Sequence, residues 1–90
     1  MQRQRNDIEH VTISIRDSEL VKSTLDGDQK SFARLMTLYK KRIVAIGMGF
    51  FKNAADTEDF VQEVFLKAYT KLDTFRGDSL FSTWLTRIAY

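Results

Sequence analysis

The chain contains no proline and only four glycines in 90 residues. Average usage of about 5% would place roughly four or five prolines in a chain of this length. Proline and glycine mark the turns of β-rich and loop-rich folds, so their scarcity favours long, uninterrupted helices. We therefore expect an all-α fold with one small hydrophobic core in a single domain.

The residue types that the chain lacks exclude several kinds of site. Without cysteine there is no disulfide scaffold, thiolate zinc site, iron–sulfur cluster or cysteine nucleophile, and the lone His10 cannot hold a metal by itself. Serine and threonine residues lack a histidine or lysine base at a suitable spacing, and no glycine-rich phosphate loop is present. We expect neither enzymatic activity nor a cofactor.

The hydrophobic segments are too short for a membrane protein. The longest apolar run covers residues 43–51, far short of the roughly 20 residues that span a bilayer. Residues 1–16 lack the apolar stretch of a signal peptide. These features predict a cytoplasmic protein.

Capping residues predict where the first two helices begin and end. The first helix is expected to be short, with an N-cap at Asp17 or Ser18 and a closing glycine at Gly27. The second begins after Asp28, and its apolar residues recur in steps of three and four. That apolar stripe consists of Phe32, Leu35, Met36, Tyr39, Ile43, Ile46, Gly47 and Phe50.

Two further helices follow. A polar break at residues 53–57 precedes the third, which runs to about Leu72, and Asp78 or Ser79 is expected to cap the fourth. The predicted architecture is a compact bundle of four helices over residues 17–90. In it the second and third helices form the main antiparallel pair, and the fourth packs across them through Phe81, Trp84 and Ile88.

Two segments leave alternatives open. Gly47 and Gly49 lie inside the second helix, where they indicate either a close helix contact or fraying before residue 53. Residues 1–16 are interpreted as a tail that is flexible or is ordered by a partner. Within it Val11, Ile13 and Ile15 alternate with polar residues, a pattern that a strand would show.

The charges are strongly segregated although the net charge is only +2. Residues 30–52 carry six basic and no acidic groups, whereas residues 53–66 carry four acidic and no basic groups. The basic cluster at residues 40–42 is interpreted as a solvated face or a surface near nucleic acid.

The third helix presents an acidic stripe with an apolar centre. On a helical wheel its core face contains Val61, Val64, Phe65, Ala68 and Leu72. The opposite face carries Asp59, Gln62 and Glu63 around Leu66. A single exposed leucine is ordinary, but an apolar centre with a charged rim is typical of a protein-binding patch.

The fourth helix combines aromatic and basic residues. Arg87 borders Trp84, and Lys67, Lys71 and Arg76 add positive charge. Such a surface can follow a phosphate backbone and stack bases, although a solvated face beside a core tryptophan has the same composition.

These residues together resemble region 2 of bacterial sigma factors, and most closely the extracytoplasmic-function (ECF) group. The resemblance covers about residues 20–90. It rests on GDQKSF at residues 27–32, DTEDFVQEVFLKAY at 56–69, FRGDS at 75–79 and FSTWLTRIA at 81–89.

The resemblance implies a transcription initiation factor with two binding surfaces. Asp59, Gln62, Glu63 and Leu66 would dock on the clamp helices of the largest catalytic subunit of core RNA polymerase. The second surface would recognise and melt the minus-ten promoter element and hold the non-template strand. Its residues would be Phe75, Arg76, Gly77, Asp78, Ser79, Thr83, Trp84 and Arg87.

The resemblance also implies departures and rivals. The recognition helix is expected to be truncated at Tyr90, and the helix-turn-helix domain that reads the upstream promoter element (region 4) is absent from the 90 residues. The alternative function is a helical interaction module bound by an anti-sigma factor without direct DNA binding. A generic helix-turn-helix protein is a weaker rival, because the acidic stripe opposes phosphate docking.

Overall fold

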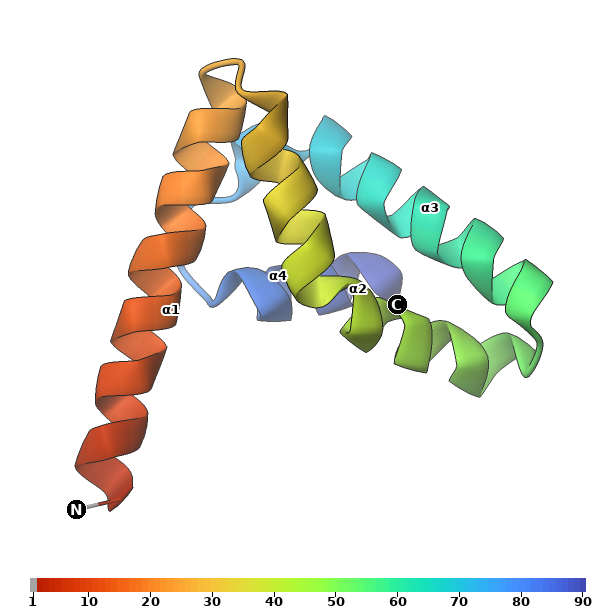
Figure 1. The fold of residues 1–90 in the computed structure, drawn as a ribbon, viewed down its shortest axis with the longest axis horizontal. Helices are drawn as coiled ribbons and strands as arrows, with labels where there is room; N and C mark the ends of the chain where they lie inside the picture. Colours follow the sequence, from red (N-terminus) through yellow and green to blue (C-terminus); the bar gives the residue numbers. More distant parts are fainter. Residues whose placement is uncertain (1) are drawn as a thin grey trace.

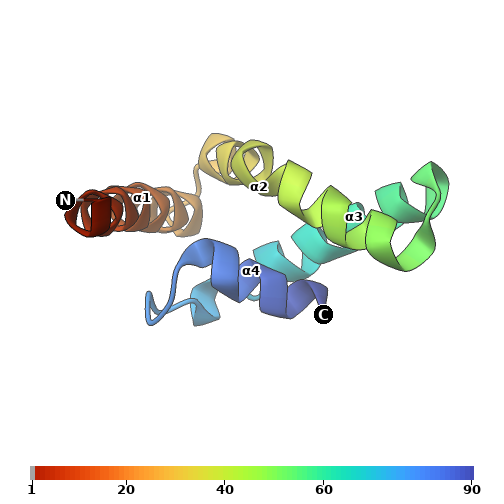
Figure 2. The same cartoon turned by 90° about the horizontal axis from the view of Figure 1, so that it is seen from below.

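The structure is a computed structural model that describes the backbone of residues 2–90 and the side chains of residues 7–90. Within these residues the chain forms four α-helices and one short 3-10 helix, which confirms the predicted all-α class. α2 and α3 form an antiparallel hairpin, and α4 packs beneath it (Figures 1 and 2). The elements are α1 (Gln2–Leu25), α2 (Gln29–Phe51), α3 (Ala54–Thr70), η1 (Leu72–Thr74) and α4 (Phe81–Ala89).

Local capping sets the limits of the hairpin. Asp28 caps α2 by accepting a hydrogen bond from the Lys30 amide at 3.1 Å, as predicted. The C-cap of α2 is Lys52, whose φ of 60° lies in the left-handed region. Asn53 then caps α3 by accepting a 2.8 Å hydrogen bond from the Asp56 amide. Among residues 2–90, no helix has both the length and the apolar character needed to cross a membrane.

The core lies where the four helices meet. The predicted core face of α3 is confirmed, since its members are buried, with Leu72 contributed by η1. The side chains that the core buries most completely are Leu35, Ile43, Ala68, Leu72, Phe81 and Leu85.

The first helix is much longer than predicted. It begins at Gln2 rather than at Asp17 or Ser18, and the strand-like alternation of Val11, Ile13 and Ile15 lies within it. Its N-terminal half extends away from the other helices (Figure 1). The predicted closing glycine is confirmed, because Gly27 follows α1 with a φ of +108°. The division between a tail and a domain at residue 17 stays a prediction, and residue 1 lies outside the described part.

The start of α4 also differs from the prediction. Its N-cap is Leu80, which provides no side-chain hydrogen bond, so neither Asp78 nor Ser79 caps the helix. α4 packs into the core mainly through Phe81 and Leu85, which are fully buried. Trp84 and Ile88 are half-buried at the edge of the core rather than inside it.

The two glycines of α2 have different surroundings. A Cβ atom on Gly47 would lie 2.9 Å from both the Phe60 ring and the Thr57 methyl, so this glycine marks the closest approach of α2 to α3. A Cβ on Gly49 would meet nothing within 4 Å. Only the first glycine is therefore required by a close helix contact.

Candidate nucleic-acid and protein-binding surfaces

The acidic stripe of α3 is exposed as predicted. Asp59, Gln62 and Glu63 face solvent, and Leu66 beside them has 66% of its surface exposed. The spacings of three and four residues place these side chains next to one another on one helix face. None of the three polar side chains forms a hydrogen bond or ion pair with another described residue. The stripe is thus free to contact a partner.

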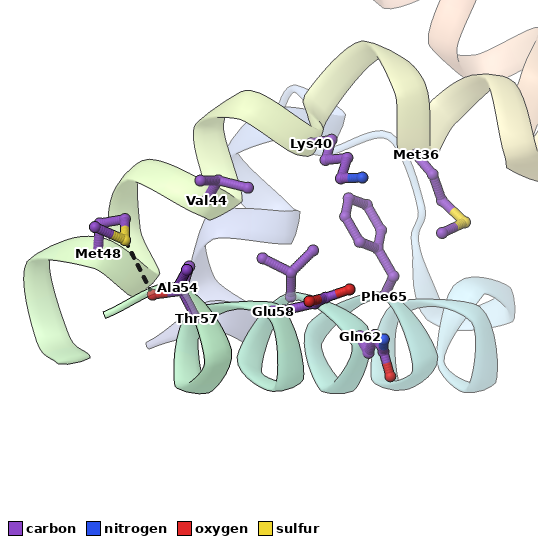
Figure 3. A pocket seen from close by; sticks show the side chains of 10 residues that line it. Met36, Lys40, Val44, Met48, Ala54, Thr57, Glu58, Gln62 and Phe65 are labelled. Atoms are coloured by element: carbon purple, nitrogen blue, oxygen red, sulfur yellow. Dashed lines mark hydrogen bonds between the residues drawn. The ribbon is translucent and has the colours of Figure 1, made fainter. Parts of the chain in front are cut away.

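An apolar groove continues from this stripe toward α2. It has a volume of about 350 Å³ and is walled by Met36, Val44 and Met48 of α2 and by Phe65 of α3. Figure 3 shows these side chains between the two helices, with Lys40, Glu58 and Gln62 around them. Gln62 belongs to both the stripe and the groove, so the two form one continuous surface. This groove was not predicted, because it depends on how α2 and α3 pack.

A second hollow lies between the end of α3 and α4. We call it the Trp84 hollow, and its volume is about 470 Å³. Three cations surround the half-buried indole, as the pattern of basic and aromatic residues predicted. The residues that line it are Lys67, Lys71, Thr74, Trp84, Arg87 and Ile88.

The acidic half of α3 precedes its basic end. Acidic side chains near the N-terminus of a helix and basic ones near its C-terminus both favour the helix dipole. The charge segregation therefore stabilises α3 and also separates the acidic stripe from Lys67 and Lys71. A polyanion would be attracted to one end of this helix and repelled from the other.

The loop between η1 and α4 lies beside the Trp84 hollow but supplies none of its lining residues. Phe75 is half-buried, and its ring packs 5.5 Å from both Phe81 and Trp84. Arg76 does not line the Trp84 hollow, contrary to the predicted grouping, and instead faces α1 across a separate depression. The structure therefore places the two arginines of the predicted surface, Arg76 and Arg87, on different sides of the Phe75–Trp84 pair.

The other predicted nucleic-acid residues lie on the same loop and on α4. Gly77 has a φ of +78°, which a residue with a side chain rarely adopts, and Asp78 beside it is exposed. Ser79 is half-buried and donates a 3.2 Å hydrogen bond to the Leu80 carbonyl. Thr83 is half-buried on α4 and does not line the Trp84 hollow.

One buried polar cluster was missed by the sequence analysis. Asp17, only 2% exposed, accepts hydrogen bonds from the Tyr39 hydroxyl and, at 3.1 Å, from Nε of Arg16. Burial, with the hydrogen bond to Asp17 and its charge, raises the pKa of Tyr39 to about 12. The cluster joins α1 to α2. No local pattern indicates it, because Asp17 and Tyr39 are 22 positions apart.

Metal ligands are not grouped in the described part of the chain. No three histidine, aspartate or glutamate side chains among residues 7–90 lie close enough to hold a metal ion. The surfaces instead carry charged side chains, aromatic rings and apolar side chains, which suit binding to macromolecules.

Comparisons with known proteins indicate one family. The family model "Sigma-70 region 2" matches residues 35–90. The ECF RNA polymerase sigma-E factor of Escherichia coli K12 is 44% identical over 75 residues, covering 83% of this chain and 39% of the relative. The RNA polymerase sigma-H factor of Pseudomonas aeruginosa is 42% identical over 74 residues, 82% of this chain and 38% of the relative.

A solved structure is also similar. It is the NMR structure of an engineered region 2 of sigmaE in complex with GTAAAA, with 41% sequence identity and a TM-score of 0.74. The match covers 81% of this chain and 76% of that chain. The chain spans about two fifths of the length of the curated relatives it matches. Family model, relatives and fold agree, and the chain belongs to the sigma-70 region 2 family, within the ECF group of sigma factors.

Proposed function

We propose that this chain is the part of an ECF sigma factor that docks on core RNA polymerase and recognises and melts the minus-ten promoter element. It holds the non-template strand by binding alone, without catalysis, in the bacterial cytoplasm. The observation that carries the proposal is the Trp84 hollow, with three cations around an accessible indole, on a fold whose solved relative holds GTAAAA.

The DNA-binding side of the proposal is supported by charge and by exposed ring surface. Lys67, Lys71 and Arg87 can neutralise phosphates, while the indole of Trp84 offers a face on which an unstacked base can lie. Extruding a base from the duplex costs a few kcal/mol, which stacking and phosphate contacts offset. A single strand should therefore bind better than a duplex.

The polymerase side is supported by the free acidic stripe. Asp59, Gln62, Glu63 and Leu66 form an apolar centre with a polar rim, and the groove beside Gln62 can accept an apolar side chain. The clamp helices that dock there must present basic residues to Asp59 and Glu63. Polymerase and DNA then occupy separate faces and can be bound at the same time.

The DNA-binding proposal is tested by titrating the domain with single-stranded GTAAAA while the fluorescence of Trp84, its single tryptophan, is recorded. Binding should weaken with salt with a logarithmic slope of about −2, since three cations each contribute about −0.7. Arg87→Gln should weaken binding about tenfold and make the slope less steep by about 0.7. Lys52→Gln, which removes an exposed cation in the turn between α2 and α3, is the matched control. If wild type binds single strand and duplex equally, strand holding is refuted.

The polymerase proposal is tested by pull-down of core RNA polymerase at one fixed salt concentration. Glu63→Lys and Leu66→Asp should each reduce the bound fraction strongly. Glu19→Lys and Ile15→Asp make the same chemical changes on exposed positions of α1 and serve as controls. If all four variants bind alike, α3 is not the docking face.

An anti-sigma partner is the alternative that the same surfaces allow. The apolar groove between α2 and α3 and the free stripe give such a partner a place to bind without any DNA. An interaction module of this kind would show no salt-dependent binding of GTAAAA. If wild type binds the oligonucleotide and Arg87→Gln loses that binding while the control variant keeps it, the DNA-binding function is favoured over the interaction module.

A further inference from the structure

A third hollow lies on the other side of the loop, between that loop and α1. We call it the α1 hollow. Figure 1 shows the segment between η1 and α4 passing beside α1. The hollow has a volume of about 360 Å³, with Lys22, Leu25 and Asp26 on the α1 side and Phe75, Arg76 and Gly77 on the loop side.

The α1 hollow is adjacent to the Trp84 hollow. Phe75 lines the α1 hollow, and its ring packs 5.5 Å from the Trp84 ring, which lines the other hollow. The two hollows are thus separated by one pair of aromatic side chains. A single strand that places one base beside Trp84 can place a neighbouring base beyond Phe75.

The chemistry of the α1 hollow suits a nucleotide better than a simple anion. Lys22 and Arg76 can contact phosphates, and Leu25 and Phe75 provide apolar contact to a base. Asp26, however, repels anions, so neither free phosphate nor an acidic peptide fits the whole set. An ionised carboxylate only accepts hydrogen bonds, and the exocyclic amino groups of adenine, cytosine and guanine are donors. Thymine has no such group.

The charged side chains of the α1 hollow are not held by contacts with the rest of the domain. Lys22, Asp26 and Arg76 form no side-chain hydrogen bond or ion pair with any other described residue, and Leu25 is 52% exposed. Asp26 follows the last residue of α1, where the negative end of the helix dipole disfavours a carboxylate. Its position opposes the stability of α1 and favours a donor from a ligand.

We propose that the α1 hollow binds a second base of the same single strand and that Asp26 selects a base with an exocyclic amino group. This inference rests on the proposed function, because it extends the path of the strand that the Trp84 hollow holds. It makes Asp26, just after α1, a specificity-determining residue and Lys22 of α1 a phosphate contact. The predicted DNA surface included neither residue.

The test uses GTAAAA and five analogues, each lacking one exocyclic amino group. Each adenine in turn is replaced by unsubstituted purine, and the guanine is replaced by hypoxanthine. Binding is measured through Trp84 fluorescence for wild type, Asp26→Ala and the matched control Glu58→Ala, which also removes one exposed carboxylate. Lys22→Gln and Lys52→Gln form a second matched pair for the phosphate contact.

We expect one analogue to bind wild type and Glu58→Ala about tenfold more weakly than GTAAAA, which corresponds to about 1.4 kcal/mol. In Asp26→Ala that penalty should disappear, while thermal stability stays equal or rises. Lys22→Gln should weaken the binding of all six oligonucleotides by the same factor, and Lys52→Gln should not.

Two results would overturn the inference. If each analogue loses the same affinity relative to GTAAAA in Asp26→Ala as in wild type, Asp26 selects no base even though the strand is bound. If unmodified GTAAAA fails to bind wild type, the proposed function fails first and this inference fails with it. The unmodified oligonucleotide therefore separates the two failures.

Discussion

Gly47→Ala should destabilise the domain, although alanine is the better helix former. A Cβ at this position would lie 2.9 Å from Cδ2 of Phe60 and 2.9 Å from Cγ2 of Thr57. Neither neighbour can move easily. Thr57 is buried and donates a 2.7 Å hydrogen bond to the Asn53 carbonyl, and the Phe60 ring packs against Phe50 at 5.9 Å.

The magnitude follows from two opposing effects. Overpacking a well-filled contact costs about 1–3 kcal/mol. Replacing glycine by alanine inside a helix returns about 1 kcal/mol. The net loss for Gly47→Ala should therefore be about 1 kcal/mol, whereas Gly49→Ala, with nothing within 4 Å, should gain about 0.5 kcal/mol. For a domain of this size the two variants should differ in Tm by roughly 6–12 °C.

Urea unfolding followed by circular dichroism measures both variants against wild type. A second-site change sharpens the test: Thr57→Ser removes the methyl group that the new Cβ meets and keeps the hydroxyl that bonds to Asn53. It should restore part of the stability of Gly47→Ala. If Gly47→Ala is as stable as Gly49→Ala, the close contact between α2 and α3 does not require glycine and the reasoning is refuted.

Three further predictions concern single residues. Because the pKa of Tyr39 is raised, its contribution to stability is complete below about pH 10 and is lost as the pH rises toward 12; the difference in unfolding free energy between wild type and Tyr39→Phe should shrink over that interval in urea titrations, and a constant difference would contradict it. Lys52→Gly should raise Tm by several degrees in a thermal melt, since Lys52 pays about 1 kcal/mol for its left-handed backbone. Gly77→Ala should lower the unfolding free energy by about 1 kcal/mol for the same reason, and Gly77→Asn by less.

What the sequence predicts well is the part of the fold that repeats along one helix. The third helix has a regular apolar period, so both its buried face and the exposed Leu66 follow from residues three and four apart. The caps at Asp28 and Asn53 involve hydrogen bonds two or three residues away. Such local relations need no knowledge of the rest of the chain.

The features that sequence analysis missed depend on contacts between distant segments. Asp17 has a residue type that is common at N-caps, but it lies in the middle of α1. Its buried position follows only from its contact with Tyr39 of α2. The alternation at residues 11–15 has a period of two, yet these residues continue α1. The basic and aromatic residue types group Arg76 with Trp84, whereas the path of the loop turns Arg76 toward α1.

The arrangement of the aromatic residues links the proposed DNA binding to stability. Phe81 is 1% exposed, and the Phe75 and Trp84 rings both pack on it at 5.5 and 5.6 Å. The walls of both proposed base sites are therefore the outer layer of the core. A strand that binds only the folded domain must then stabilise it by an amount that grows with the logarithm of the ratio of strand concentration to Kd. For the same reason Phe75→Ala should lose stability and binding together, whereas Lys22→Gln and Asp26→Ala touch only the binding surface. Variants of the second kind are thus the ones that can show how the strand is recognised.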